Sequence, residues 1–351
     1  MKPVLKWTGT KEEMTPLLLP FVPSHFNRYY EPFFGSGALY YALETDYAFA
    51  NDHCPELITM YRLIQDGNGK LVRYYAAAID AWRNMDTVFI RLKENLYELY
   101  WRKKNGVFSD YLSFVSAATK FVGRMDYEEI FPLAFSKEET FRMEARHIVI
   151  QHILQMEEKQ DLSEQTIYGN LHTALKDAMY SYFQQLYNET GTKDSEKSAF
   201  LMFLMGYSMG TRYLYDDVGE FRIPYGGKRL NKVSMADRLD VLKSDAFREK
   251  MKNTHFSAME FHRFFGHYVP KKGDFIYLDP PEDGAVGACG SCVFSVAEHT
   301  RLASYLLNDC PAKWMMTVHR HKFVNQLYGH KGLDIRPVKE GGNLLLIRNY
   351  T

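Results

Sequence analysis

The chain has 351 residues, of which 46% are hydrophobic, enough for one large domain or for one domain that carries an insertion. Lysine plus arginine and aspartate plus glutamate balance at 43 each, which excludes a strongly basic, non-specific nucleic-acid binder. The longest apolar stretch, 199–210, is too short to span a bilayer, and the first residues contain no apolar run of signal-peptide length. We therefore expect a soluble, cytoplasmic protein that contacts nucleic acid, if at all, through local basic patches.

The first zone, residues 1–66, alternates short strands with helical patterns. RYYEPF (28–33) and DYAFAND (46–52) are typical of buried strands, and FGSGALYYAL (34–43) between them is a glycine turn that opens a helix. A strand, helix and strand in this order predict a parallel sheet of the α/β class.

Two features of this zone suit a cofactor site. Gly35 and Gly37 permit a tight turn in which a ligand can approach the main chain, although such a turn can equally be structural. Asp52 ends the second strand, where an acidic side chain can accept hydrogen bonds from ribose hydroxyls. The alternative is that Asp52 or Asn51 caps the helix that begins near Pro55.

The second zone, residues 67–194, is mostly helical. Apolar residues recur every three or four positions over 85–103, which predicts an amphipathic helix. Further helical patterns lie near 107–121, 138–158 and 170–188. This zone therefore interrupts the sheet domain as a helical insertion.

Strands return in the third zone, from about residue 195. The candidates are 253–261, 273–279, 313–318, 333–338 and 343–350. The last two are joined by KEGG (339–342) and predict an antiparallel hairpin at the end of the sheet.

The sequence GDFIYLDPPE (273–282) contains the most informative turn. Asp279 ends an apolar strand at the edge where open α/β sheets bind ligands. Pro280 and Pro281 fix the backbone and remove two N–H donors, so the turn presents the Asp279 carboxylate and the Pro280 carbonyl as acceptors. Two acceptors in a fixed turn suit a group with two N–H donors, such as an exocyclic amine.

Two further groups allow more than one interpretation. Arg222, Lys228, Arg229 and Lys232 form a basic run that can neutralise phosphates or can be an ordinary solvated loop. Cys289 and Cys292 have the spacing of half a zinc site, but the other two cysteines form no second pair, so we expect no metal.

The order of these motifs resembles the Dam-like family of DNA adenine-N6 methyltransferases. The matching segments are KWTGTK (6–11), EPFFGSGAL (31–39), NDHCPELI (51–58), FRIPYG (221–226) and DPP (279–281). Additional similar segments are 196–227, 258–261, 294–306, 314–328 and 344–350. The resemblance covers roughly 1–66 and 180–351, whereas 67–180 shows no recognisable similarity.

The resemblance implies a Rossmann-like, S-adenosylmethionine-dependent methyltransferase sheet with a C-terminal antiparallel hairpin and a large helical insertion. Residues 1–66 and 195–351 would form the catalytic domain. Residues 67–194 would serve target recognition or bind a protein partner.

It also implies roles for individual residues. Trp7, Lys11, Asp52 and Asp279 fall on positions that bind S-adenosylmethionine, with Glu31 in the same group and Gly35 and Gly37 shaping the pocket. Asp279 and Pro280 would hold the N6 amine of an adenine flipped out of double-stranded DNA, and Pro281 and Glu282 complete the catalytic turn. The expected DNA contacts are Arg222, Lys228, Arg229 and Lys232.

The sequence departs from the family pattern at the catalytic turn. Glu282 stands where an aromatic residue usually stacks on the flipped base, and Glu260 and Thr10 replace an aspartate and a glycine. Three functions remain open: an active adenine-N6 DNA methyltransferase, an impaired methyltransferase-fold subunit that binds DNA or cofactor within a larger complex, and a methyltransferase for an amine of RNA or protein. The resemblance to the family also implies a role in restriction–modification or phage defence. Enzymes of the third kind commonly carry asparagine at the first position of the turn, so Asp279 argues against it.

Overall fold

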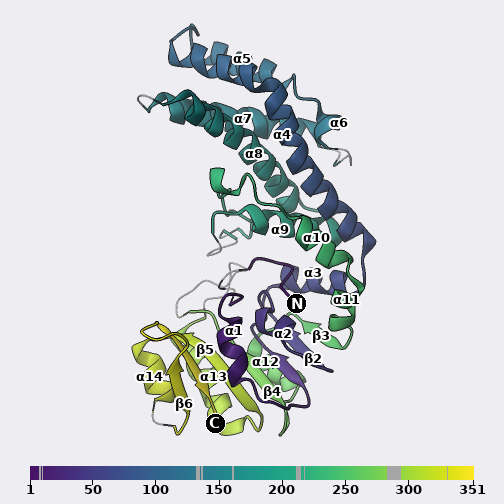
Figure 1. Ribbon diagram of the computed structural model, residues 1–351, viewed down its shortest axis with the longest axis vertical. Coiled ribbons are helices and arrows are strands. Elements are labelled where there is room, and N and C mark those ends of the chain that lie inside the picture. Colours follow the sequence, from purple (N-terminus) through teal and green to yellow (C-terminus); the bar gives the residue numbers. More distant parts are fainter. Residues whose placement is uncertain are drawn as a thin grey trace. The chain divides into compact units, whose positions relative to one another are not determined.

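The computed structural model describes residues 1–7, 9, 11–131, 135, 137–159, 162–210, 215–216, 218–282, 294–329 and 331–351 (Figure 1). The chain divides into two compact units. A sheet unit contains residues 1–68, 211–222 and 241–351, and a helical unit contains residues 69–210 and 223–240.

The described part of the sheet unit contains one seven-stranded sheet with the order β3-β2-β1-β4-β5-β7-β6. The strands are β1 (Tyr29–Glu31), β2 (Ala48–Asn51), β3 (Thr254–Ser257), β4 (Phe275–Leu278), β5 (Lys313–His319), β6 (Asp334–Pro337) and β7 (Leu344–Arg348). β1 to β5 pair in parallel, whereas β7 runs antiparallel to both β5 and β6. The predicted Rossmann-like sheet with a C-terminal antiparallel hairpin is therefore confirmed.

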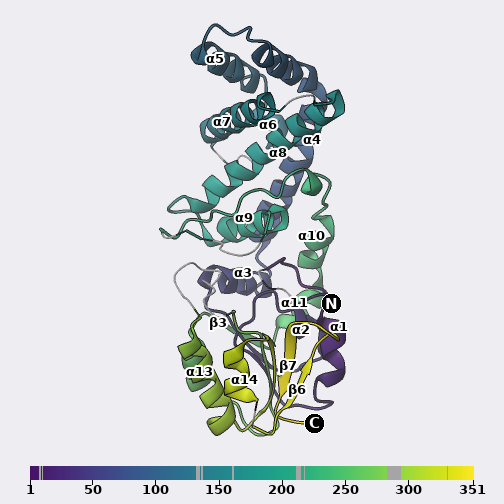
Figure 2. The same cartoon turned by 90° about the vertical axis from the view of Figure 1, so that its left-hand side faces the viewer.

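Helices cover both faces of this sheet (Figure 2). They are α1 (Thr15–Leu18), η1 (Leu19–Phe21), α2 (Ala38–Ala42), α3 (Pro55–Gln65), α11 (Asp245–Met251), α12 (Phe261–His267), α13 (Val296–Ser304), the π-helical turn η3 (Tyr305–Asp309) and α14 (Lys322–Tyr328). α12, α13 and α14 pack on one face, around buried strand residues such as Tyr30, Ile276 and Trp314. Burial of this apolar face, at roughly 25 cal/mol per Å², is the main force that holds the sheet in place.

The opposite face carries polar groups near its carboxyl edge. Because side chains alternate along a strand, Tyr29 and Glu31 of β1 share this face, as do Tyr277 of β4 and Thr317 of β5. Tyr29 packs near Tyr40 of α2, with ring centroids 6.2 Å apart. The candidate site lies where these buried polar groups reach the ends of the strands.

The helical unit contains α4 (Gly69–Lys104), α5 (Tyr111–Val122), α6 (Tyr127–Ile130), α7 (Glu138–Glu157), α8 (Glu164–Asn188), α9 (Asp194–Tyr207) and the short helix η2 (Lys228–Leu230), while α10 (Ala236–Lys243) leads from it back to the sheet unit. The helix predicted over 85–103 is confirmed but begins already at Gly69. The helix predicted over 170–188 begins at Glu164, because Ser163 accepts a hydrogen bond from the backbone N–H of Thr166 and so caps it.

The grouping of α9 differs from the predicted division at 194/195, since α9 belongs to the helical unit. Residues 198–205 of α9 are all buried, so this helix needs neighbours on every side, and it packs against α4 and α8. A helix with one apolar face shows from its sequence which side packs against the rest of the fold. A helix that is apolar on all sides, such as α9, gives no such indication. The roles predicted for the two units remain predictions.

The chain after α9 makes antiparallel contacts. Ser208 bridges Tyr225, and Tyr215 bridges Phe221. The N–H of Met209 donates to the carbonyl of Pro224 at 2.9 Å.

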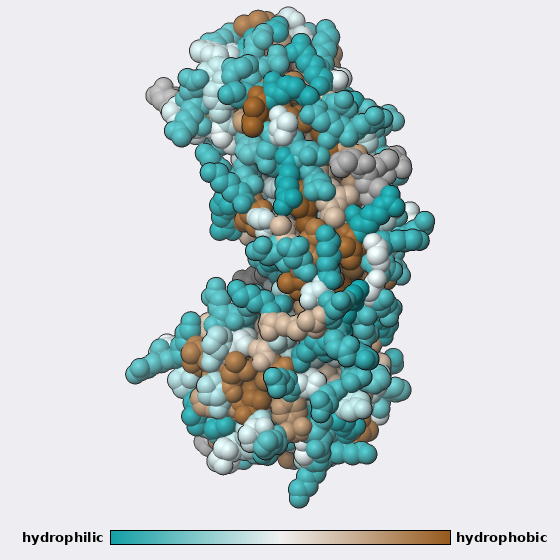
Figure 3. Space-filling model, turned by 45° about the vertical axis from the view of Figure 1, so that its right-hand side comes forward, coloured by the Kyte–Doolittle hydropathy of each residue, from teal (hydrophilic) through white to brown (hydrophobic). Residues whose placement is uncertain are grey.

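The surface is mixed. On the face drawn in Figure 3, hydrophilic side chains cover most of the molecule and hydrophobic side chains gather in small patches. Within the residues that the structure describes, every helix is too short or too polar to cross a membrane.

Candidate active site

The glycine turn after β1 brings the main chain close to an aromatic side chain. Gly35 and Gly37 have φ values of +49° and +64°, which side chains other than glycine rarely adopt. A Cβ at Gly35 would lie 3.1 Å from Cδ1 of Trp7, and a Cβ at Gly37 only 2.4 Å from Cζ of Phe34. Both glycines are therefore required by local geometry, and Trp7, which is 3% exposed, lines the turn.

Asp52 ties the end of β2 to this turn. Its Oδ2 accepts from the N–H of Gly35 at 2.8 Å, and its Oδ1 accepts from the N–H of Cys54 at 3.0 Å. The hydroxyl of Tyr61 donates to the carbonyl of Gly35 at 3.0 Å. Burial raises the pKa of Asp52, and the N–H groups of Gly35 and Cys54 oppose that rise. Asp52 thus acts on the cofactor-type turn, whereas the N-cap of α3 is Cys54, without a side-chain cap.

Asn51 is an organising residue that the sequence interpretation did not identify. Its amide donates to the carbonyls of Pro32 and Met259, at 3.0 and 2.8 Å, and its Oδ1 accepts from the hydroxyl of Ser257 at 2.8 Å. The buried side chain therefore joins the ends of β1, β2 and β3. The alternative role of Asn51 as a helix cap is wrong, because its side chain is already used by these strands' ends.

Asp279 is held by two different partners in the catalytic-type turn. Its Oδ2 lies 2.9 Å from Nζ of Lys11, and its Oδ1 accepts from the hydroxyl of Thr317 at 2.7 Å. The hydroxyls of Thr317 and Tyr277 are 2.9 Å apart. Thr317 and Tyr277 are both buried, and the sequence analysis did not predict their role beside Asp279. This chain of contacts fixes the carboxylate at the carboxyl end of β4.

Glu31 adds a third carboxyl group to the same edge. It is 2% exposed, and its Oε2 accepts from the hydroxyl of Tyr29 at 2.7 Å. Burial raises the pKa of Glu31 well above its usual value, and the charges of Asp279 and Asp52 act in the same direction. Glu31, Asp52 and Asp279 are therefore close enough at this edge for their charges to act on one another.

Glu282 occupies the position at which an aromatic residue was expected, and its side chain contacts a histidine. Its Oε1 lies 3.4 Å from Nε2 of His319, two residues beyond Thr317 on β5. The Glu282 side chain is 49% exposed, and that of His319 is 38% exposed. Alternate residues of β5 thus contact both ends of the turn, Thr317 at Asp279 and His319 at Glu282.

A hollow of about 410 Å³ lies beside the start of α12. It is lined by His53, Ala258, Met259, Glu260, His262 and Arg263. Glu260 lies 3.4 Å from Nδ1 of His262, so the acidic residue that departs from the family pattern faces this hollow. The carboxyl ends of β2 and β3 lead into it, which is where parallel sheets bind ligands.

The predicted DNA-contacting cations have different surroundings. Arg222 pairs with Asp216 at 3.0 Å and with Glu220. Lys228, Arg229 and Lys232 are exposed and make no ion pair within the described part of the chain. Arg222 belongs to the sheet unit and the other three belong to the helical unit. The free cations are therefore those on and beside η2.

Some predicted features lie outside the described residues. They are Thr10 and the pair Cys289 and Cys292. Over the ranges that are described, histidine, cysteine, aspartate and glutamate form no group of three that could hold a metal ion.

Comparison with known proteins extends the resemblance. A family model described as D12 class N6 adenine-specific DNA methyltransferase matches residues 7–124 and 143–340. The match includes residues 67–124 and 143–180, so the expectation that 67–180 shows no similarity to the family is wrong for these residues.

A curated relative is the Type II methyltransferase M1.LlaDCHI of Lactococcus lactis subsp. cremoris. It is 38% identical over 72 residues, which are 20% of this chain and 25% of the relative. The chain thus matches only about a quarter of that relative's length. Since the family model matches most of the sequence, the chain belongs to the family of D12 class N6 adenine-specific DNA methyltransferases.

Proposed function

We propose that this chain transfers a methyl group from S-adenosylmethionine to N6 of an adenine in double-stranded DNA. The observation that carries the proposal is the fixed Asp279–Pro280 turn, in which Lys11 and Thr317 hold the carboxylate at the carboxyl edge of the sheet. A site-specific activity of this kind fits restriction–modification, since the curated relative is named a Type II methyltransferase, and we place it in the cytoplasm.

The residues at this edge fit S-adenosylmethionine, which supplies an electrophilic methyl group on a sulfonium ion. Asp52 lies beside the glycine turn and suits the ribose hydroxyls, while Trp7 closes the turn from the other side. Glu31 is a buried carboxyl group whose raised pKa would fall beside a cation. The cofactor carries an ammonium and a sulfonium charge, so it suits this acidic edge better than an anion does.

Asp279 and Pro280 provide the acceptors for the target amine. Within the described residues no backbone N–H donates to the Pro280 carbonyl, so this oxygen would accept one amine proton. The Asp279 carboxylate would accept the other proton and keep the nitrogen lone pair directed at the reacting methyl group. An adenine amine lies inside the base stack, so the base must flip out, at a cost of roughly a few kcal/mol. Positioning of the two reacting groups would supply much of the rate.

A second candidate is an impaired transferase that binds cofactor or DNA as part of a larger complex, with the helical unit as its partner interface. The specific observation in its favour is the Glu282–His319 contact at 3.4 Å. A carboxylate at this position gives no stacking, and base–aromatic stacking is worth roughly 1–3 kcal/mol. In this candidate the turn keeps its shape but holds a flipped base too weakly for turnover.

The deciding experiment is methyl transfer from labelled S-adenosylmethionine to mixed-sequence duplex DNA, with N6-methyladenine measured by mass spectrometry. Methyladenine formed by the wild-type chain supports the proposal. Product formed only by Glu282→Tyr supports the second candidate. If neither chain forms methyladenine although both bind S-adenosylmethionine, transfer to DNA adenine is overturned, and RNA and protein are the next substrates to assay.

A further inference from the structure

The basic run KRLNK (228–232) has one buried member. Lys228, Arg229 and Lys232 are exposed, whereas Asn231 between them is 8% exposed. Lys228 to Leu230 form the short helix η2, so Asn231 follows directly on the turn that carries two of the cations. A buried polar side chain in a basic surface run requires partners in the interior.

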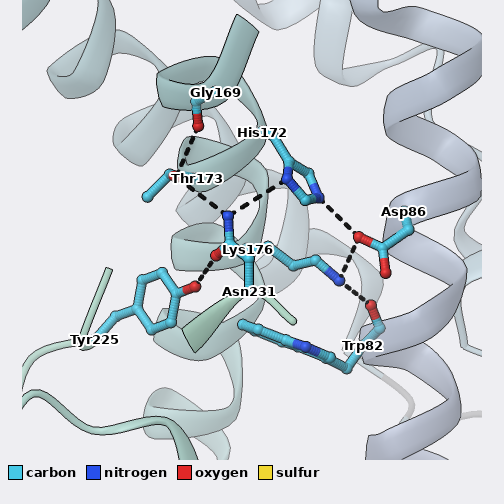
Figure 4. A network of polar contacts seen from close by, with 8 residues as sticks. All are labelled: Trp82, Asp86, Gly169, His172, Thr173, Lys176, Tyr225 and Asn231. Atoms are coloured by element: carbon cyan, nitrogen blue, oxygen red, sulfur yellow. Dashed lines mark hydrogen bonds and ion pairs between the residues drawn. The ribbon is translucent and has the colours of Figure 1, made fainter. Parts of the chain in front are cut away.

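Asn231 uses its whole amide group in the interior of the helical unit (Figure 4). Its Oδ1 accepts from the hydroxyl of Tyr225. Its Nδ2 lies 3.2 Å from the hydroxyl oxygen of Thr173 and 3.3 Å from Nδ1 of His172. The run is thus attached to α8 and to the returning strand of the antiparallel pair by one side chain.

The attachment continues to a buried charge on α8. Nε2 of His172 lies 2.7 Å from Oδ1 of Asp86 on α4, and Nζ of Lys176 lies 2.8 Å from the same oxygen. The Lys176 side chain is fully buried, donates to the carbonyl of Trp82 and lies 4.4 Å from the centre of a Trp82 ring. Its burial lowers the pKa of Lys176 to about 8, against the opposing effect of Asp86.

The partners fix where the protons lie. A carboxylate only accepts, so Nε2 of His172 carries the proton that it gives to Asp86. Because the Asn231 Nδ2 only donates, Nδ1 of His172 is then its acceptor. The hydroxyl of Thr173 donates to the carbonyl of Gly169 at 2.8 Å, which leaves its oxygen free to accept from Asn231. Every member therefore has a consistent role, and only an amide in one orientation completes the network.

This is a demanding way to hold a surface loop, because Lys176 is fully buried while its partner Asp86 is 45% exposed, and burying a charge in this way often stabilises a fold no better than apolar packing does. Its distinctive effect is to specify one arrangement. We propose that Asn231 is a positioning residue that fixes the basic run 228–232 on the helical unit, so that Lys228, Arg229 and Lys232 meet DNA phosphates together. The proposal rests on the DNA-binding function proposed above.

The test is DNA binding by Asn231→Ala, measured by fluorescence anisotropy on one duplex over a range of salt concentrations. Loss of the anchor lets the run move, so we expect affinity to fall about tenfold. The slope of log affinity against log salt should fall by roughly 2, because each phosphate contact contributes about 0.9 to it. Asn308→Ala removes an exposed asparagine of the sheet unit, whose amide donates to the hydroxyl of Ser304 at 3.3 Å, and is the matched control.

A double-mutant cycle of Asn231→Ala with Arg229→Ala, measured by DNA binding, distinguishes a positioning role of Asn231 from a purely structural one. If Asn231 acts through the cations, Arg229→Ala weakens binding much less in the Asn231→Ala background than in the wild type. Additive losses overturn the proposal. Amide hydrogen exchange should also increase over 225–232 in Asn231→Ala and remain unchanged in α8.

Thr173→Val is the second variant, for the case that Asn231→Ala unfolds the helical unit. It keeps the shape of α8 and removes one acceptor of Asn231. It is expected to show the same losses at smaller size. If the wild-type chain binds no duplex, the proposed function itself fails. If the wild type binds and both variants bind equally well with the same salt slope, the anchoring role alone is overturned.

Discussion

Asp279 and Glu282 belong to one turn, but neighbouring residues hold the Asp279 side chain more firmly than the Glu282 side chain. Both oxygens of Asp279 have close partners on other elements, Lys11 and Thr317, and both partners are largely buried. Glu282 is half exposed, and the contact that the described residues show for it is with His319. The first position of the turn is therefore firmly placed, whereas the last is the position at which a substitution changes chemistry without disturbing the fold.

The first prediction concerns Glu282→Tyr. A tyrosine restores an aromatic surface for the flipped base, so the rate of adenine methylation should rise about tenfold, as expected for roughly 1–3 kcal/mol of stacking. Glu340→Tyr, on the exposed turn between β6 and β7, is the control and should leave the rate unchanged. A Glu282→Tyr rate at or below that of the wild type would argue that Glu282 is itself the functional residue.

Thr317→Val is the second prediction. The valine cannot donate to Asp279 and leaves the buried hydroxyl of Tyr277 without this partner, so the free energy of unfolding should fall by about 1–3 kcal/mol. The methylation rate should fall because the carboxylate is less well oriented, with the affinity for S-adenosylmethionine less affected. Urea denaturation and single-turnover kinetics measure the two effects. Thr300→Val, at an exposed position of α13, is the control, and equal behaviour of the two variants would contradict the assignment.

The third prediction is a pH dependence that arises from Glu31. Its pKa is higher in the folded chain than in the unfolded chain, chiefly because of burial, so between these two values the folded chain binds more protons. The free energy of unfolding without cofactor should therefore fall as pH rises from the usual glutamate pKa through the raised one. Glu31→Gln keeps an acceptor for Tyr29 and should flatten this slope in urea denaturation at several pH values. A slope equal to that of the wild type would show that other groups dominate.

At the scale of elements, the turn between β1 and α2 is where sequence and packing agree most closely. The spacing of its glycines predicts the turn, and their positive φ values explain why glycine is needed. The helix that follows has only five residues, so the geometry of the turn, with Trp7 and Asp52 against it, defines this part of the site.

The fourth prediction compares two glycines with the same backbone strain. Gly37 and Gly341 have φ of +64° and +68°, but a Cβ would meet Phe34 at 2.4 Å in the first case and nothing within 4 Å in the second. Gly341→Ala should cost about 1 kcal/mol of stability through strain alone. Gly37→Ala should cost roughly 1–3 kcal/mol more, because the Phe34 ring must move. Thermal unfolding decides, and equal losses would mean that Phe34 adjusts without cost.

The strands were predictable as elements because apolar residues and turn residues alternate locally along the chain. The start of α8 was not, since Glu164, Gln165 and Thr166 in its first turn weaken the periodic pattern, and the pattern over 85–103 did not show that α4 begins at Gly69. The assignment of α9 depended on partners supplied by other helices. Local sequence therefore defines the type of an element better than its ends or its neighbours.

At the scale of the whole molecule, charge is balanced, with 43 basic and 43 acidic residues. Affinity for DNA must then come from cations without an acidic partner, and among the described residues those on and beside η2 meet this condition whereas Arg222 does not. Arg222 is better suited to shape its own loop, because it pairs with Asp216 and Glu220.

The fifth prediction follows for Arg229→Ala. One lost phosphate contact should lower the slope of log affinity against log salt by about 0.9 and weaken binding to all duplex sequences alike. Arg222→Ala should change the slope less, since Asp216 and Glu220 already neutralise that charge. Lys339→Ala, in the exposed turn between β6 and β7, is the control with no expected change. A larger effect from Arg222 than from Arg229 would reverse this assignment.

The class of the fold, the strands, the glycine turn, and Asp52 and Asp279 at the ends of strands could all be predicted from the amino-acid sequence, because these features depend on local spacing and on alternation of apolar residues. Which groups act together became clear only from the folded chain. Asn51 joins three strand ends, Thr317 holds Asp279, and Asn231 reaches a buried lysine through His172 and Asp86. These partners lie tens to hundreds of positions apart in the chain. A hydrogen bond depends on distance and direction in space, and the order of residues alone does not encode either.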